Sequence, residues 1–148
     1  MPKVKGYAFK DELLRTDTVS VYRSEKISDK QLVIVKLLNE AYPTQESIEQ
    51  LDREYNIAGN LDMPGVVKPY SLDPVGRGKI LVLEDFEALP LSTFLDSKPL
   101  EIRLFLELAI RMAGLLSQVH RNNIIHCNLT PSSFWINPQS REIKIDNF

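Results

Sequence analysis

The sequence predicts an α+β fold, in which short strands and one helix come first and a mainly helical segment follows. In the first part of the 148-residue chain, β-branched and other apolar residues gather in short runs separated by polar stretches, as is typical of strands. After Pro99, apolar residues recur at helical spacing over a long segment. This order indicates a sheet-based unit followed by a helical one.

Three strands are predicted to form an antiparallel meander, and a helix and two further strands follow them. The helix takes Thr44 or Ser47 as its N-cap, with Ser47 and Gln50 as a capping box, and ends near Gly59 or Asn60. The predicted strands are 7–14, 19–26, 31–38, 66–72 and 79–84, with a turn-rich segment at 73–78 between the last two.

A long amphipathic helix dominates the second half. We expect it to run from Pro99 to about Arg121, after a short helix over 91–95 and before a polar loop and a hairpin of two short strands. Its apolar stripe is broad enough to leave some members exposed, so we expect self-association or a covering partner. The stripe contains Ile102, Phe105, Leu106, Ala109, Ala113, Leu116 and Val119.

Composition excludes several classes of protein. The formal net charge of −2 gives no reason to expect binding to nucleic acid or to an anionic membrane. The single cysteine, Cys127, cannot form an internal disulfide, and the first residues contain no apolar run typical of a signal peptide. No stretch is long and apolar enough for a membrane span. These features predict a cytoplasmic location.

Five short segments, taken in order, resemble motifs of the protein-kinase family, and the resemblance covers essentially the whole chain. The matches are 33–36 with the third-strand V-A-I-K, Glu54 with the glutamate of the C-helix, 80–86 with the strand that leads into the hinge, 126–133 with the catalytic loop H-R-D-L-K-P-x-N, and 146–148 with D-F-G. Segments 37–43 and 64–72 most resemble the kinase module at the front of large bacterial multi-domain sensor kinases.

This resemblance implies a protein-kinase-like fold with two lobes. Residues 1–85 would form a complete N-lobe, with a five-stranded antiparallel sheet and the C-helix, and residues 86–148 a partial helical C-lobe. The chain is then expected to stop at the D-F-G-like position, either as a fragment or as a natural truncation. The rest of a larger signalling chain or another protein would be its partner.

The resemblance also implies a nucleotide site. In the family the strand lysine, here Lys36, is oriented onto ATP phosphates by the helix glutamate, here Glu54. Two other interpretations stay open: Lys36 as a solvated charge, and an ion pair that only docks the helix on the sheet. The positions that would line the adenine are Val21, Ile34, Leu83, Glu84 and Phe86, with Ile34 in place of a smaller alanine.

The loop that would cover the phosphates departs from the family pattern. Its three glycine positions fall on Leu14, Thr16 and Val19. Glycine is needed there because a Cβ prevents close approach of backbone N–H groups to phosphate. Asp17 adds a negative charge near the tip. We therefore expect weak binding of ATP and Mg²⁺, or none.

The catalytic loop departs further. Asn128 stands in place of the aspartate base, and Thr130 in place of the lysine that neutralises the γ-phosphate. Ser133 replaces the metal-binding asparagine and would be at best a weak ligand. Cys127 replaces an arginine and is interpreted as a small buried side chain, whereas the retained His126 has a structural role in the family.

The metal-binding aspartate depends on the alignment. If Phe148 is the phenylalanine of D-F-G, Asn147 takes the aspartate's place, and this is the favoured alignment. The alternative makes Asp146 the magnesium ligand.

Three hypotheses for function follow from these departures. The favoured one is a non-catalytic pseudokinase module in signal transduction, and its rival is an active Ser/Thr protein kinase, or the front piece of one, that transfers the ATP γ-phosphate to protein. The third is a gene remnant without function. Whether the chain is an enzyme stays open at this stage.

Overall fold

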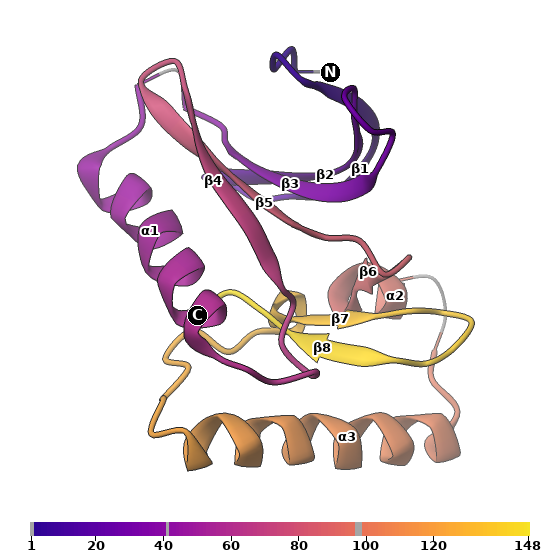
Figure 1. The fold of residues 1–148 in the computed structure, drawn as a ribbon. Helices are drawn as coiled ribbons and strands as arrows, with labels where there is room; N and C mark the ends of the chain where they lie inside the picture. Colours follow the sequence, from indigo (N-terminus) through magenta and orange to yellow (C-terminus); the bar gives the residue numbers. More distant parts are fainter. Residues whose placement is uncertain (1, 41, 97–98) are drawn as a thin grey trace. The chain divides into compact units, whose positions relative to one another are not determined.

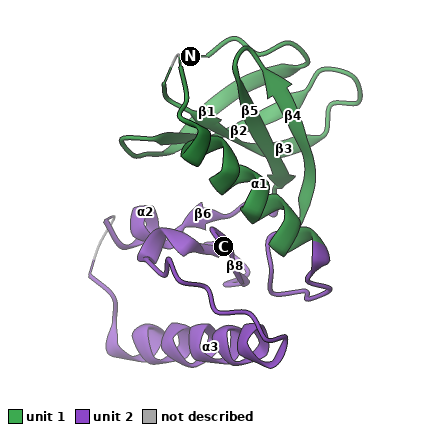
Figure 2. Cartoon of the chain, turned by 90° about the vertical axis from the view of Figure 1, so that its left-hand side faces the viewer, with its two compact units in different colours: residues 1–59, 68–85 green, residues 60–67, 86–148 purple. Residues whose placement is uncertain are grey.

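The computed structural model describes residues 2–40, 42–96 and 99–148, so Ala41 within the segment 37–43 lies outside the described residues. It has the predicted α+β architecture (Figure 1). The chain divides into two compact units, shown in different colours in Figure 2. The first unit contains residues 1–59 and 68–85, and the second contains residues 60–67 and 86–148.

The first unit is built on a five-stranded antiparallel sheet with the strand order β1-β2-β3-β5-β4. The first three strands form the predicted meander, because each pairs with the next along the chain. The strands are β1 (Tyr7–Arg15), β2 (Val19–Lys26), β3 (Leu32–Leu38), β4 (Pro69–Val75) and β5 (Gly78–Glu84).

Alternation along the two central strands gives the sheet two different faces. Val33 and Val35 of β3 and Ile80 and Val82 of β5 are fully buried in one cluster. Part-buried side chains from the N-terminal segment and from β1, among others, pack against this cluster. The intervening residues of β3 and β5, among them Lys36, must point to the other face.

The helix of the first unit, α1 (Gln45–Asn60), begins where Thr44 caps it. The backbone N–H of Ser47 donates to Thr44 Oγ1 (3.2 Å), so Thr44 is the N-cap. Ser47 therefore lies inside the first turn, and the predicted capping box of Ser47 with Gln50 is wrong. The helix buries Leu51, Glu54 and Ala58 on one side.

The boundaries of β4 differ from the prediction. The strand begins at residue 69 and continues to residue 75, so most of the predicted turn is strand. The turn itself is limited to Gly76, which has a positive φ, and Arg77. Val66 and Val67 pair elsewhere: Val66 bridges Ile145, and the Val67 N–H donates to the Ile145 carbonyl (3.0 Å). Their β-branched side chains are buried in the second unit, which explains the strand-like pattern.

The second unit contains the two predicted helices and the predicted hairpin. The helices are α2 (Leu91–Asp96) and α3 (Ile102–Arg121), and the hairpin strands are β7 (Phe134–Ile136) and β8 (Ile143–Ile145). A two-residue strand, β6 (Leu89–Pro90), pairs with β7. A single 3-10 turn, η1 (Pro131–Ser133), comes directly before β7 in the chain. Both elements are too short to produce a sequence pattern.

Much of the predicted stripe of α3 is exposed, as expected for a stripe too broad to be covered, and a different row of residues is buried. Leu108, Leu115 and Val119 are buried, whereas Ile102 (72%) and Ile110 (72%) are among the most exposed apolar side chains. Of the predicted stripe only Val119 is buried, while Phe105 and Leu106 are about half exposed and Ala113 is exposed. In Figure 1 α3 runs alongside β7 and β8. Leu108, Leu115 and Val119 form the buried side of the helix.

The described residues contain no helix with the length and apolarity that crossing a membrane requires.

Candidate functional site

A buried ion pair joins the sheet and the helix of the first unit. Lys36 Nζ donates to Glu54 Oε1, and the two side chains are only 3% and 4% exposed. Lys36 lies on β3, and Glu54 lies on the buried side of α1. Lys36 is therefore not a solvated surface charge. A charge this deeply buried requires a partner, so the pair holds helix and sheet together.

Strand register places the predicted lining residues of the first unit on the same face as Lys36. Val21 on β2 lies opposite Lys36, and Ile34 lies opposite Leu83 on β5. Cross-strand neighbours share a face, so these side chains form one surface. Val21, Ile34 and Leu83 are each buried.

The two remaining predicted lining residues lie on either side of the division between the units. Glu84 ends β5 in the first unit, and its Oε1 accepts from the backbone N–H of Lys68 (2.9 Å). Phe86 belongs to the second unit, where its carbonyl accepts from Asn137 Nδ2 (2.9 Å) and Lys144 Nζ lies 4.8 Å from its ring centroid.

A second ion pair, which the sequence reasoning missed, lies on the same face of the sheet. Arg23 Nε donates to Asp85 Oδ2 (2.6 Å), and the Asp85 side chain is 1% exposed. Arg23 lies opposite Ile34, so it shares the face of Ile34 and Lys36. Since β3 lies between β2 and β5, Arg23 must cross β3 beside Ile34 to reach Asp85. Its position two residues after Val21 was the signal that could have placed it there.

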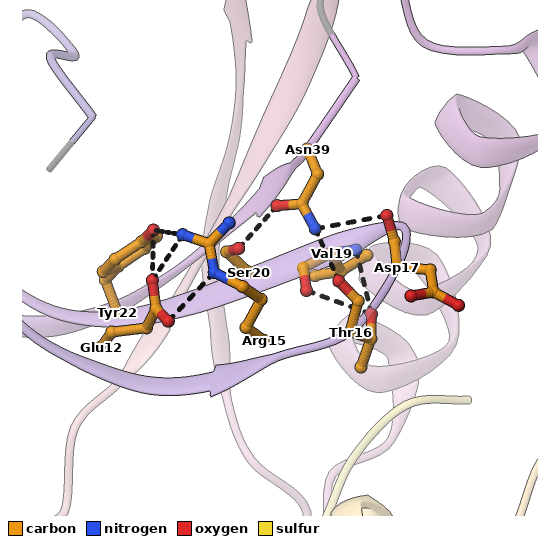
Figure 3. Close-up of polar contacts among 8 residues, drawn as sticks. All are labelled: Glu12, Arg15, Thr16, Asp17, Val19, Ser20, Tyr22 and Asn39. Carbon is orange, nitrogen blue, oxygen red and sulfur yellow. Dashed lines mark hydrogen bonds and ion pairs between the residues drawn. The ribbon is translucent and has the colours of Figure 1, made fainter.

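The turn between β1 and β2, which corresponds to the phosphate-covering loop, is held by hydrogen bonds within itself (Figure 3). The Thr16 N–H donates to the Val19 carbonyl (2.9 Å), and the Val19 N–H donates to Thr16 Oγ1 (3.0 Å). Two backbone donors of the turn are therefore already used. Leu14, the remaining position at which the family pattern has glycine, lies within β1 opposite Val21.

Beside the turn, Glu12 accepts hydrogen bonds from two side chains (Figure 3). Arg15 donates to both of its carboxylate oxygens (3.0 and 2.6 Å), and the Tyr22 hydroxyl donates to Oε2 (2.8 Å). The hydrogen bonds from Arg15 first, and then from Tyr22, lower the pKa of Glu12 to about 2. Burial, followed by the bond to Glu12, raises the pKa of Tyr22.

In the second unit, the catalytic-loop side chains bond to their own loop. Ser133 is fully buried, and its hydroxyl donates to the Asn128 carbonyl (3.0 Å) and accepts from the Thr130 N–H (3.1 Å). Asn128 and Thr130 are themselves exposed. The loop is thus held by neutral groups.

Cys127 is exposed and has a positive φ of 60°, so the expectation of a small buried side chain is wrong. The backbone conformation turns this residue out of the loop core, whereas its neighbour His126 is buried.

His126 connects the loop to the end of the chain. Its Nε2 lies 2.7 Å from the Asp146 carbonyl, and its ring packs 4.9 Å from the ring of Phe148. Asp146 is fully buried, and its N–H donates to the Ser133 carbonyl (2.8 Å). Asn147 has a left-handed φ of 63°, and its Nδ2 donates to the Ser132 carbonyl (3.2 Å).

These residues form a poor donor set for Mg²⁺, an ion that prefers carboxylates and water. Of the three predicted ligands Ser133, Asn147 and Asp146, only Asp146 has a carboxylate. The Ser133 hydroxyl and the Asn147 amide both donate to carbonyls of the loop. The described residues contain no group of three or more His, Cys, Asp or Glu side chains arranged to hold a metal ion.

Comparison with known proteins gives one family and two relatives. The model of a family described as protein tyrosine and serine/threonine kinase matches residues 11–148. The serine/threonine-protein kinase PrkC of Bacillus subtilis (strain 168) is 27% identical over 131 residues, which cover 87% of this chain and 20% of PrkC. The serine/threonine-protein kinase pkn2 of Myxococcus xanthus is 28% identical over 122 residues, which cover 82% of this chain and 15% of pkn2. The chain thus spans a fifth or less of the length of these relatives.

Proposed function

This chain belongs to the protein tyrosine and serine/threonine kinase family, and from that premise we propose that it is a non-catalytic, pseudokinase-type module of signal transduction. The observation that carries the proposal is the catalytic loop, in which Asn128 and Thr130 occupy the positions of the base and of the phosphate-neutralising lysine. A neutral amide cannot accept the proton of a substrate hydroxyl, a role that contributes about 10²–10⁴ in rate.

The loss of the base is compounded by the loss of cationic and metal-binding groups. A threonine carries no positive charge to neutralise a transferring phosphoryl group. The Ser133 hydroxyl, which would stand at a metal position, is bonded inside the loop. We therefore propose weak binding of ATP and Mg²⁺, or none.

Our proposal assigns Asn147 to the position of the metal-binding aspartate. Phe148 packs against His126, as expected if the phenylalanine directly follows that position. Asp146 instead follows β8 directly and continues the strand. Its N–H donates to the Ser133 carbonyl, and its own carbonyl bonds to His126 Nε2. In the alternative, Asp146 would be the strongest ligand available to a magnesium ion.

The second candidate function is that of an active Ser/Thr protein kinase or a piece of one. The buried Lys36–Glu54 pair favours it, because the family uses this pair to position ATP. Both relatives also carry the name serine/threonine-protein kinase. Under either function we propose that the module acts within a longer cytoplasmic signalling chain, since its relatives are several times longer.

Phosphoryl transfer tests the proposal directly. We expect the chain, incubated with ATP, Mg²⁺ or Mn²⁺ and generic protein substrates, to give no more transfer than its Lys36→Met variant. Transfer that this substitution abolishes would establish the active kinase instead.

A chimera removes the objection that the isolated chain is inactive only because it is short. The 131 residues that match PrkC would replace the corresponding segment of PrkC, and we expect this chimera to be inactive. Returning Asn128→Asp, Thr130→Lys, Ser133→Asn and Asn147→Asp together should raise its activity. An active chimera without these substitutions would contradict the proposal.

A further inference from the structure

Asn39, the first residue after β3, bonds to three successive carbonyl groups of the β1–β2 turn. Figure 3 shows the bonds to two of them, the carbonyls of Thr16 and Asp17. Its Nδ2 donates to the carbonyls of Thr16 (2.7 Å) and Asp17 (3.4 Å), and its backbone N–H donates to the carbonyl of Thr18 (2.8 Å). Its Oδ1 accepts from the hydroxyl of Ser20 (2.5 Å). One residue therefore fixes the orientation of every peptide group at the tip of the turn.

These bonds decide what the turn can offer to a ligand. The N–H groups of Thr16 and Val19 already bond within the turn. Of the described residues in the turn, Asp17 and Thr18 at the tip are the two whose N–H groups make no hydrogen bond. One of these two residues carries a carboxylate, so an approaching phosphate would meet a negative charge beside the remaining donors.

Phosphate binding by a loop requires several backbone N–H groups that converge on one point. In this turn the carbonyls converge instead, and they converge on Asn39. To form a phosphate cradle the turn would have to break the bonds to Asn39 and the internal Thr16–Val19 bonds. The arrangement thus opposes phosphate whether or not glycines are present.

We propose that Asn39 is a positioning residue that holds the β1–β2 turn closed to phosphate. The inference deepens the proposed function and rests on it, because it names the device that keeps triphosphates off the nucleotide face. Val21, Ile34 and Leu83, the predicted contacts of the base, lie on this face and not in the turn. The closed turn therefore discriminates against the phosphates of a nucleotide and not against its base.

Amide hydrogen exchange followed by NMR tests the closed turn without any ligand. In the wild-type chain we expect the Thr16 and Val19 amides to be protected. Asn39→Ala should raise their exchange rates by about tenfold, the factor that corresponds to about 1.4 kcal/mol. Ser20→Ala is the matched control, because it removes one bond to Asn39 and leaves the three carbonyl bonds intact. Unprotected amides in the wild-type chain, or equal effects of both variants, would overturn the proposal.

Binding of adenosine and ATP, measured by titration, tests the consequence. We expect ATP to bind the wild-type chain no more tightly than adenosine, and Asn39→Ala to shift this ratio toward ATP by about threefold to tenfold. The control is Leu14→Gly with Val19→Gly, which restores two glycines and keeps Thr16 and Asn39. If these glycines alone shift the ratio and Asn39→Ala does not, Asn39 is not the determinant.

The two proposals fail in different ways. Phosphoryl transfer by the wild-type chain would remove the proposed pseudokinase function, whatever the exchange rates of the turn. Fast exchange at Thr16 and Val19 without phosphoryl transfer would remove only the role of Asn39.

Discussion

The Lys36–Glu54 pair and the catalytic-loop segment 126–133 present opposite solutions to placing polar groups in a fold. The pair buries two opposite charges, 3% and 4% exposed, between a strand and a helix. The loop keeps neutral groups, and its two substituted positions, Asn128 and Thr130, are exposed. The ion pair supports the fold of its unit, whereas the two loop positions contribute little to the packing of theirs.

This difference shows how the pair should be interpreted. Removing one partner of a buried ion pair leaves an uncompensated charge, which strongly destabilises a protein. Stability alone therefore explains why Lys36 and Glu54 occur together, and their presence is not sufficient evidence for catalysis. Asn128 and Thr130 carry more information about function, because stability does not dictate their identity.

The largest expected effect concerns this ion pair. Lys36→Met or Glu54→Leu alone should lower the free energy of unfolding by about 3–5 kcal/mol, since each removes the ion-pair partner of a buried charge. The double variant should recover most of that loss. Urea unfolding is the measurement, with Asn128→Ala as the exposed control at about 0.5 kcal/mol or less. A single variant as stable as the wild-type chain would show that the pair does not hold helix and sheet together.

The two sides of α3 provide the next comparison. Leu108→Ala should cost about 2–5 kcal/mol because it leaves a cavity, whereas Ile110→Ala should change stability by about 0.5 kcal/mol or less. Ile110→Glu should also reduce self-association, because Ile102, Phe105 and Ile110 are all exposed apolar residues. Light scattering at micromolar concentration measures the association. A monodisperse wild-type chain would contradict the expected self-association.

A smaller effect is expected at Ser133. Ser133→Ala leaves the Thr130 N–H and the Asn128 carbonyl without their shared partner and should cost about 1–3 kcal/mol. Asn128→Ala, at an exposed position, is the control and should cost less. Chemical unfolding followed by the fluorescence of buried Trp135, in the adjoining strand, reports on this part of the chain. Equal costs for the two variants would show that burial of Ser133 is not what secures the loop.

Local pattern was sufficient for most of the fold. The first three strands and both helices of more than ten residues were predicted close to their observed bounds, because each carries its own apolar period. The start of β4 was not predictable, since Val66 and Val67 pair with Ile145, far away in the sequence. The exposure of Ile102, Phe105 and Leu106 on α3 was expected. Which side of the helix is buried was not predicted, because both sides are apolar and only tertiary packing selects one.

The candidate site divides in the same way. Lys36 and Glu54 were identified from motif spacing, and the structure brings them together. Asn39 and the Arg23–Asp85 pair were missed, because each depends on a partner that strand register alone brings near. The roles assigned to Asn128, Thr130 and Asn147 stay predictions.

The smallest expected effect is a pH dependence at Glu12, in β1 beside the turn. Hydrogen bonds from Arg15 and then Tyr22 lower its pKa from 4.5 to about 2 in the folded chain. Since the folded pKa lies below the unfolded one, the carboxylate stabilises the fold above pH 4.5, and this contribution is lost as the pH falls toward about 2. Glu12→Gln should therefore narrow the stability difference between neutral and acid pH, by a modest amount because the group is exposed and screened by salt.

NMR titration of the Glu12 carboxyl measures its pKa directly. Tyr22→Phe, which removes one donor and keeps Arg15, should raise that pKa only part of the way toward 4.5. A titration midpoint near 4.5 in the wild-type chain would show that the Arg15 and Tyr22 bonds do not persist in solution.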